Sequence, residues 1–150
     1  MDNPFQSIFS KNMNPDIQIP RKITTQLLHL AQISPETEVC GLIGGKNGVP
    51  THCYPVTNIA GQPQQRFLLD AKQQIAAMAQ MRERDEKLFA IYHSHPTAPA
   101  QPSEADLKLA AFPDALYLII SLNIKGVLEI RGFRLEHNKF EEVTLSLIEE

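Results

Sequence analysis

A short apolar strand that ends in two histidines constrains this chain more than any other segment. Residues 88–92 are apolar, β-branched or aromatic, which is typical of a buried strand, and His93 and His95 follow directly. Side chains alternate along a strand, so both histidines project the same way, with Cα atoms about 6–7 Å apart. Pro96 keeps His95 out of the helical region. The spacing therefore predicts two imidazoles that can converge on one zinc ion.

A helix start lies shortly after this strand. Ser103 is typical of an N-cap, and the residues behind it predict a helix from position 104. Asp106 then occupies the third helical position, where free backbone N–H groups and the helix dipole favour an ionised carboxylate. A metal ligand must be deprotonated, so the position suits one. Two histidines and one aspartate leave a fourth tetrahedral position open, which is the pattern of catalytic zinc sites.

Each feature also has a plainer interpretation. The two histidines could be ordinary polar residues at a strand end, and Ser103 with Asp106 could form only a capping box. The combination is more specific than its parts. Residues 93–106 join a strand, a loop with three prolines and a helix start in one string.

That string resembles a known motif. His-Ser-His-Pro at 93–96, with Ser103 and Asp106 behind it, is similar to the JAMM motif of the MPN-domain (Mov34) metallopeptidases. The family motif also has an upstream glutamate. Residues 36–44 resemble its Glu-x-Cys-Gly-Leu segment, in which Glu38 is the matching residue.

The resemblance spans about residues 20–147 and implies a function. It implies one Zn²⁺ per chain held by His93, His95 and Asp106, with Glu38 and Ser103 as catalytic residues. Glu38 would be the general base and Ser103 an oxyanion donor. The stand-alone prokaryotic members imply hydrolysis of a peptide or isopeptide bond after the C-terminal Gly-Gly of a ubiquitin-like sulfur-carrier protein.

Two other classes of function stay open at this point. One is a zinc hydrolase or deaminase acting on a small molecule, although the Pro-Cys-x-x-Cys string of the deaminases does not occur in this sequence. The other is a non-catalytic MPN scaffold that only binds partners. The sequence names neither the cognate carrier nor the leaving group nor the oligomeric state.

The periodicity of the chain predicts a loose N-terminal arm over 1–18 and a single domain over 19–150. The order of elements fits an α/β domain with a mixed β-sheet flanked by helices, as the resemblance to MPN/JAB1 domains and their cytidine-deaminase-like architecture also implies. We expect helices over 20–33, 70–84 and from 104, a hairpin over 38–56 turning at Asn47-Gly48, and further strands over 67–69, 88–95, 115–122, 128–135 and 143–147. Beyond Gly132 the apolar residues change phase, which predicts a β-bulge. In the second helix Ile75 is expected on the inner face.

Composition excludes some partners. The net charge is −3 and Lys and Arg do not cluster, which argues against nucleic-acid binding. No apolar run approaches 18 residues, and the first residues lack signal-peptide features, so we expect a cytoplasmic protein without membrane contact. Cys40 and Cys53 are expected as buried thiols, with a disulfide left open.

Overall fold

The computed structural model describes residues 16–110, 112–124 and 127–149. Most of the expected N-terminal arm, residues 1–15, lies outside this range. Residues 17 and 18, which were also assigned to the arm, belong to a strand. The described elements in chain order are β1 (Ile17–Pro20), α2 (Arg21–Gln32), β2 (Cys40–Lys46), β3 (Val49–Val56), α3 (Ala71–Glu83), β4 (Lys87–His95), α4 (Glu104–Leu109), β5 (Leu116–Ile124), β6 (Val127–Glu136), β7 (Lys139–Val143) and β8 (Leu145–Ile148).

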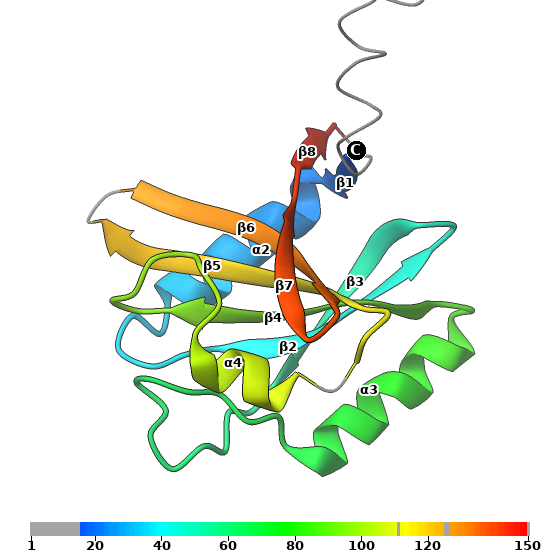
Figure 1. Cartoon of the computed structure of the whole chain (residues 1–150). Helices are drawn as coiled ribbons and strands as arrows, with labels where there is room; N and C mark the ends of the chain where they lie inside the picture. The colour runs from blue at the N-terminus through cyan, green and yellow to red at the C-terminus, as the bar shows by residue number, and fades with distance from the viewer. Residues whose placement is uncertain (1–15, 111, 125–126, 150) are drawn as a thin grey trace, which may run out of the picture.

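A mixed sheet forms the centre of the domain (Figure 1), as predicted. Its six strands are ordered β3-β2-β4-β5-β6-β7, and β1 and β8 form a separate two-stranded sheet. β4 and β5 run parallel, while the other neighbours in the large sheet are antiparallel. The histidine-bearing strand β4 is therefore central, with a hydrogen-bonded neighbour on each side.

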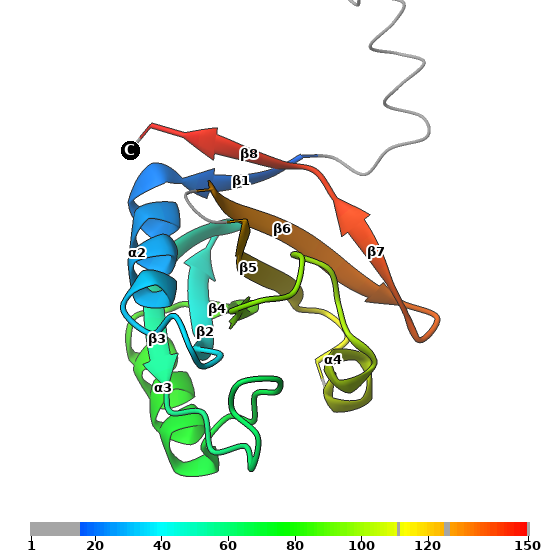
Figure 2. The same ribbon diagram turned by 90° about the vertical axis from the view of Figure 1, so that its left-hand side faces the viewer.

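Helices pack on both faces of this sheet, and Figure 2 shows α2 and α4 on opposite sides of its strands. On one face α2 buries Ile23, Leu27 and Ala31. On the other, Ala77 and Met81 of α3 join a second apolar cluster. Successive side chains of β4 and β5 point to opposite faces of the sheet. Because both faces are covered, apolar residues occupy both sets of positions, which explains the unbroken apolar runs of these two strands.

The turn between β2 and β3 forms where the sequence predicted it. Asn47 and Gly48 both adopt positive φ, at 53° and 78°. Two such residues in a row are the requirement of a type I′ turn, whose twist matches that of the flanking strands. This tight hairpin fixes β2 beside β3. The segment just before β2 carries Glu38, one residue of the candidate site.

Three predictions about strands need correction. No β-bulge follows Gly132, because the β5–β6 register runs unbroken from Leu116↔Arg134 to Ser121↔Glu129. The apolar residues change phase there because β6 faces apolar neighbours on both sides: Ile130 packs into one cluster and Phe133 into the other. The final segment is two strands, of which β7 extends the main sheet and β8 pairs with β1. Residues 67–69 contribute only an isolated bridge from Leu69 to Asn58.

Three further findings complete the fold. Ile75 is 68% exposed, so its expected place on the inner face of α3 is wrong. Cys40 and Cys53 are both free thiols. Within the described part of the chain, no helix is long and apolar enough to cross a membrane.

Candidate metal centre

The end of β4 brings two imidazoles together. His93 and His95 are both buried, and their Nε2 atoms lie 3.1 Å apart. Ser94 lies between them with its Oγ accepting a hydrogen bond from the N–H of Val39 at 2.8 Å, while its own N–H donates to the carbonyl of Val39 at 2.9 Å. The strand therefore presents both rings on one side and is clamped to the segment before β2 through the residue between them.

Asp106 reaches the same point from the first turn of α4. Ser103 is the N-cap of this helix, and its Oγ accepts a hydrogen bond from the Asp106 N–H at 3.0 Å. The Ser103 N–H donates in return to Asp106 Oδ2 at 2.9 Å. The capping box is thus present, and it does not compete with a ligand role. It holds the Asp106 carboxylate where Oδ2 lies 3.1 Å from His93 Nε2 and 3.2 Å from His95 Nε2.

The triangle of Nε2, Nε2 and Oδ2 atoms fits a tetrahedral metal ion. Ligand atoms at roughly 2.0–2.1 Å from zinc, separated by tetrahedral angles, lie about 3.3 Å from one another. The observed separations of 3.1 to 3.2 Å are close to that value. All three donors are of the nitrogen and oxygen type that zinc accepts in open sites. The residues present therefore fit the metal that the resemblance implies.

Glu38 completes the group from the segment just before β2. Glu38, His93, His95 and Asp106 each offer a ligand atom within 4.8 Å of the other three. The strand was predicted to begin at Glu38, but it begins at Cys40. The Glu38 side chain is 4% exposed, and its Oε1 has no hydrogen-bond partner among the described residues. A buried carboxylate oxygen without a protein partner is rare, and it indicates a position that a water, an ion or a substrate group can take.

Burial and proximity set the charges of this group. Burial raises the pKa of Glu38 to about 8, against an opposing contribution from His95. Burial alone would also raise the pKa of Asp106, but the hydrogen bonds from His93 and His95 outweigh it and leave this pKa well below its usual range. Burial lowers the pKa of His93. The site thus holds one firmly ionised carboxylate and one that can carry a proton near neutral pH.

The loop after β4 is fixed by hydrogen bonds to its backbone. His95 Nδ1 lies 2.7 Å from the carbonyl oxygen of Pro99, and Ser121 Oγ donates to the carbonyl of Ala98 at 2.7 Å. Ala100 is buried in the core cluster. A ligand histidine that donates its second ring N–H to a carbonyl is the usual arrangement around protein-bound metals.

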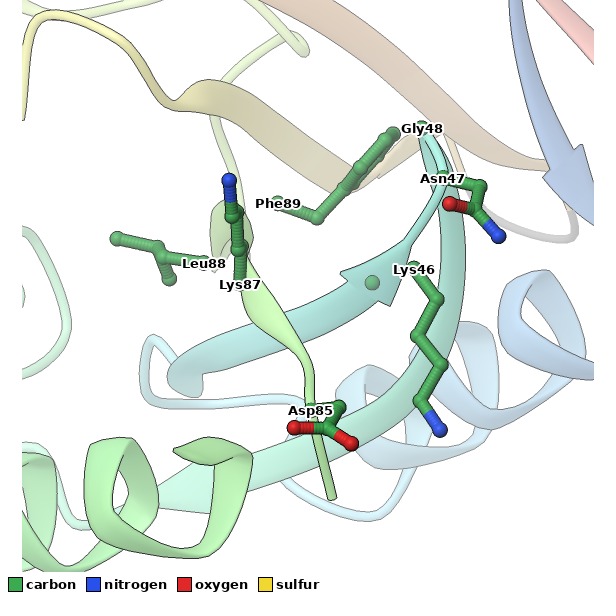
Figure 3. A pocket seen from close by; sticks show the side chains of 8 residues that line it. Lys46, Asn47, Gly48, Asp85, Lys87, Leu88 and Phe89 are labelled. Atoms are coloured by element: carbon green, nitrogen blue, oxygen red, sulfur yellow. The ribbon is translucent and has the colours of Figure 1, made fainter. Parts of the chain in front are cut away.

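Two other features lie apart from this centre. A pocket of about 570 Å³ at the beginning of β4 is lined in part by Lys46, Asp85 and Lys87 (Figure 3). Lys87 and His93 are six residues apart on one strand, so about 20 Å separates the pocket from the histidines. Neither cysteine belongs to the four-residue group, so a cysteine-rich deaminase site is not formed.

Sequence reasoning missed two residues that border the site. Phe67 stacks on the His93 ring, with centroids 4.3 Å apart and planes 19° from parallel. Asn58 donates a hydrogen bond to the carbonyl of Glu38 at 3.0 Å. Both lie in a connection whose polar composition indicated only a loop, and no local pattern points from it to the histidines.

Comparisons with known proteins agree with this geometry. The family described as prokaryotic homologues of the JAB domain matches residues 20–135. The chain is 31% identical over 130 residues to the CysO-cysteine peptidase of Mycobacterium tuberculosis, which covers 85% of this chain and 88% of that protein.

Solved structures show the same fold. The solution structure of a protein from Desulfitobacterium hafniense is similar with a TM-score of 0.80 and 31% identity, covering 89% of this chain and 93% of that one. The crystal structure of a JAB1/MPN domain protein from Archaeoglobus fulgidus is similar with a TM-score of 0.58 and 22% identity, covering 91% and 100% of the two chains. The predicted MPN/JAB1 fold class is therefore confirmed.

Proposed function

The chain belongs to the family of prokaryotic JAB-domain proteins, and from that membership we propose that it is a zinc metallopeptidase acting on the tail of a ubiquitin-like carrier protein. The observation that carries the proposal is the buried group of Glu38, His93, His95 and Asp106. The bond hydrolysed is a peptide or isopeptide bond after a C-terminal Gly-Gly. His93, His95 and Asp106 are the zinc ligands, and Glu38 and Ser103 are the catalytic residues.

Each residue has a distinct task in this proposal. When bound, zinc supplies a Lewis acid that polarises a carbonyl and makes water reactive at neutral pH. Glu38 accepts a proton from the attacking water at Oε1, the atom left without a partner, and returns it to the leaving amine. Ser103 Oγ already accepts the Asp106 N–H, so its hydroxyl hydrogen can donate to a developing oxyanion.

The substrate class rests on the family and on the wall beside the site. The Mycobacterium tuberculosis relative is named a CysO-cysteine peptidase. In this chain the loop over 97–101 has small residues and prolines around Ala98 and Ala100, and two hydrogen bonds hold its backbone. A wall of rigid backbone admits glycine and rejects a Cβ more strongly than a flexible apolar pocket does. We therefore place glycine at the scissile position.

Metal content tests the ligand assignment. Native mass spectrometry should find one zinc ion per wild-type chain and none in a His93→Ala, His95→Ala double variant. Glu38→Gln should keep zinc and lose nearly all turnover, while Glu36→Gln, which changes an exposed carboxylate two residues away, should behave as wild type. Full zinc stoichiometry in the double variant would reject the ligands. Turnover of Glu38→Gln within threefold of wild type would reject the base.

A matched substrate series tests the specificity. The substrates are carriers extended beyond Gly-Gly that differ only in glycine, alanine or valine at the scissile position, with cleavage sites read by intact mass. Cleavage should follow the second glycine and slow steeply for alanine and valine. Equal rates, or cleavage at unrelated internal sites, would reject the diglycine tail and indicate a general peptidase.

A further inference from the structure

His93 differs from His95 in what holds its ring. The Nδ1 atom of His95 lies 2.7 Å from the carbonyl of Pro99. The Nδ1 atom of His93 is buried and has no hydrogen-bond partner among the described residues. Metal-bound histidines almost always donate this second N–H to a carboxylate, a carbonyl or water, which fixes the ring orientation. Some other contact must therefore orient His93.

The face of the His93 ring supplies that contact. Phe67 is 8% exposed and its ring lies 4.3 Å from the imidazole, centroid to centroid, at 19° from parallel. Aromatic pairs favour such stacked arrangements and gain energy beyond the area they bury. Rotation of the imidazole about its Cβ–Cγ bond would drive its edge into the phenyl ring. Phe67 thus fixes the plane in which His93 Nε2 points at Asp106.

Phe67 is itself held by one amide side chain. Asn58 Nδ2 donates to the carbonyl of Arg66 at 2.9 Å, and Asn58 Oδ1 accepts from the N–H of Leu68 at 3.0 Å. These two hydrogen bonds bracket Phe67 on both sides along the backbone. The connection that carries them folds back beneath the sheet between β3 and α3 (Figure 2).

The same amide also reaches the residue proposed as the base. Asn58 Nδ2 donates a second hydrogen bond, to the carbonyl of Glu38 at 3.0 Å, and Oδ1 accepts a second from the Ala60 N–H at 3.0 Å. Two carbonyl partners on the nitrogen and two N–H partners on the oxygen use the full capacity of the amide. Asn58 therefore ties the backbone of Glu38 to the backbone on either side of Phe67.

We infer that Asn58 and Phe67 are positioning residues for the metal centre. Phe67 orients His93 by stacking in place of the missing Nδ1 hydrogen bond, and Asn58 holds Phe67 and the backbone of Glu38 in one register. The inference rests on the proposed function in one respect, because it requires His93 to bind the metal.

Four variants and one control test this. Phe67→Leu removes the flat face but keeps an apolar side chain, whereas Phe67→Tyr keeps the ring. Asn58→Ala removes all four hydrogen bonds of the side-chain amide, and Asn58→Asp keeps the acceptor oxygen and loses the donor nitrogen. The control is Gln73→Ala, which removes the hydrogen bond that exposed Gln73 accepts from the Thr57 N–H and the one that it donates to Thr57 Oγ1, at the start of the same connection; neither bond involves Phe67 or Glu38.

The readouts are zinc affinity, by competition with a chromophoric chelator, and the visible absorption spectrum of the Co²⁺-substituted protein. Removal of outer contacts around a metal typically costs 10–100-fold in affinity, and we expect that loss for Phe67→Leu and Asn58→Ala, with an altered Co²⁺ spectrum. Asn58→Asp should also lose affinity, because an oxygen then faces the carbonyls of Arg66 and Glu38. Phe67→Tyr and Gln73→Ala should stay within threefold of wild type and keep its spectrum.

Distinct outcomes reject distinct statements. Wild-type affinity and spectrum in Phe67→Leu and Asn58→Ala would overturn the inference while leaving the proposed function intact. An equal loss in Gln73→Ala would also overturn it, because general loosening of the connection would then suffice. Wild-type protein that neither binds zinc nor cleaves the carrier would overturn both. Circular dichroism of the metal-free proteins establishes folding, and if Phe67→Leu does not fold, Asn58→Asp against Phe67→Tyr decides.

Discussion

Replacing Glu38 by Gln should stabilise the metal-free protein at neutral pH, although it removes the proposed base. The Glu38 carboxyl is 4% exposed, and burial raises its pKa from 4.5 to about 8. When a carboxyl binds its proton more tightly in the folded than in the unfolded state, the protein loses stability as pH rises between the two pKa values. In that range the unfolded chain has released the proton, so folding must either take a proton up again or bury a charged carboxylate. Glutamine has the same shape and carries no charge, so the variant does not share this loss.

The size of the effect follows from the shift. Each unit between the unfolded pKa and the working pH is worth about 1.4 kcal/mol, so the wild type is penalised by about 3 kcal/mol at pH 7 relative to pH 4.5. The penalty levels off above pH 8, where the folded form also ionises. We therefore expect Glu38→Gln to be ahead of wild type by less than about 1 kcal/mol at pH 5 and by about 3 kcal/mol at pH 7.

The assay is urea unfolding of both proteins in the presence of a chelator, at pH 5, 6, 7 and 8. The difference between the two proteins is the quantity to plot, because the titration of other groups largely cancels in it. Glu36→Gln, at an exposed position, serves as the control and should show no such trend. Zinc should shrink the difference, because a nearby cation favours the ionised carboxylate. A difference that does not change from pH 5 to pH 8 would refute the reasoning.

Three further predictions concern the scaffold and the N-cap of α4, the helix that carries Asp106. Ser103→Ala should lower the free energy of unfolding by about 1 kcal/mol, measured in urea, and should slow turnover without abolishing it. Glu86→Gln should cost about 1–3 kcal/mol, because buried Glu86 accepts hydrogen bonds from three side chains of β3. Those hydrogen bonds lower the pKa of Glu86 against the effect of burial. The stability that Glu86 contributes is therefore present above pH 4.5 and is lost as the pH falls below it. In acid denaturation the variant should approach the stability of wild type in that lower range. Gly41→Ala should lower the thermal midpoint strongly, because a Cβ there would lie 2.5 Å from Tyr92 Oη, whereas Gly61→Ala, with open space around it, should not.

The half of the site that is local in sequence could be predicted. His93 and His95 follow from strand periodicity, and Asp106 follows from the N-cap chemistry of Ser103. These arguments need only the residues between 88 and 109. The structure brings the three side chains together as that reasoning required.

The other half depends on contacts between distant segments. Val39 and Ser94 are hydrogen-bonded across 55 residues of sequence, and that pairing is what brings Glu38 to the histidines. No periodicity within either segment indicates it, and only the family resemblance pointed to Glu38. Phe67 reaches His93 in the same way, through a connection without regular structure, and for it the resemblance gave no hint.

The wrong predictions about the fold have a related cause. The inner face of α3 is set by where the helix meets the sheet, and it buries Ala77 and Met81 while larger Ile75 faces solvent. The apolar change of phase beyond Gly132 indicated a bulge only on the assumption that β6 has one covered face. Local patterns indicate which residues can be buried, but not which other helices and strands will pack against them.

The properties that make the centre reactive are the ones that the fold tolerates least. A buried carboxyl oxygen of Glu38 and a buried ring nitrogen of His93 both lack partners among the described residues, and each such group opposes folding. Outside the site no other buried side-chain nitrogen or oxygen of the described residues lacks a partner, and buried Glu86 has a partner on each oxygen. The contrast indicates that the open position at Glu38 Oε1 is kept for a ligand rather than left by loose packing. Asn58 holds the backbone of Glu38 and Phe67 stacks on the His93 ring, so both side chains keep their place in the metal centre despite this cost.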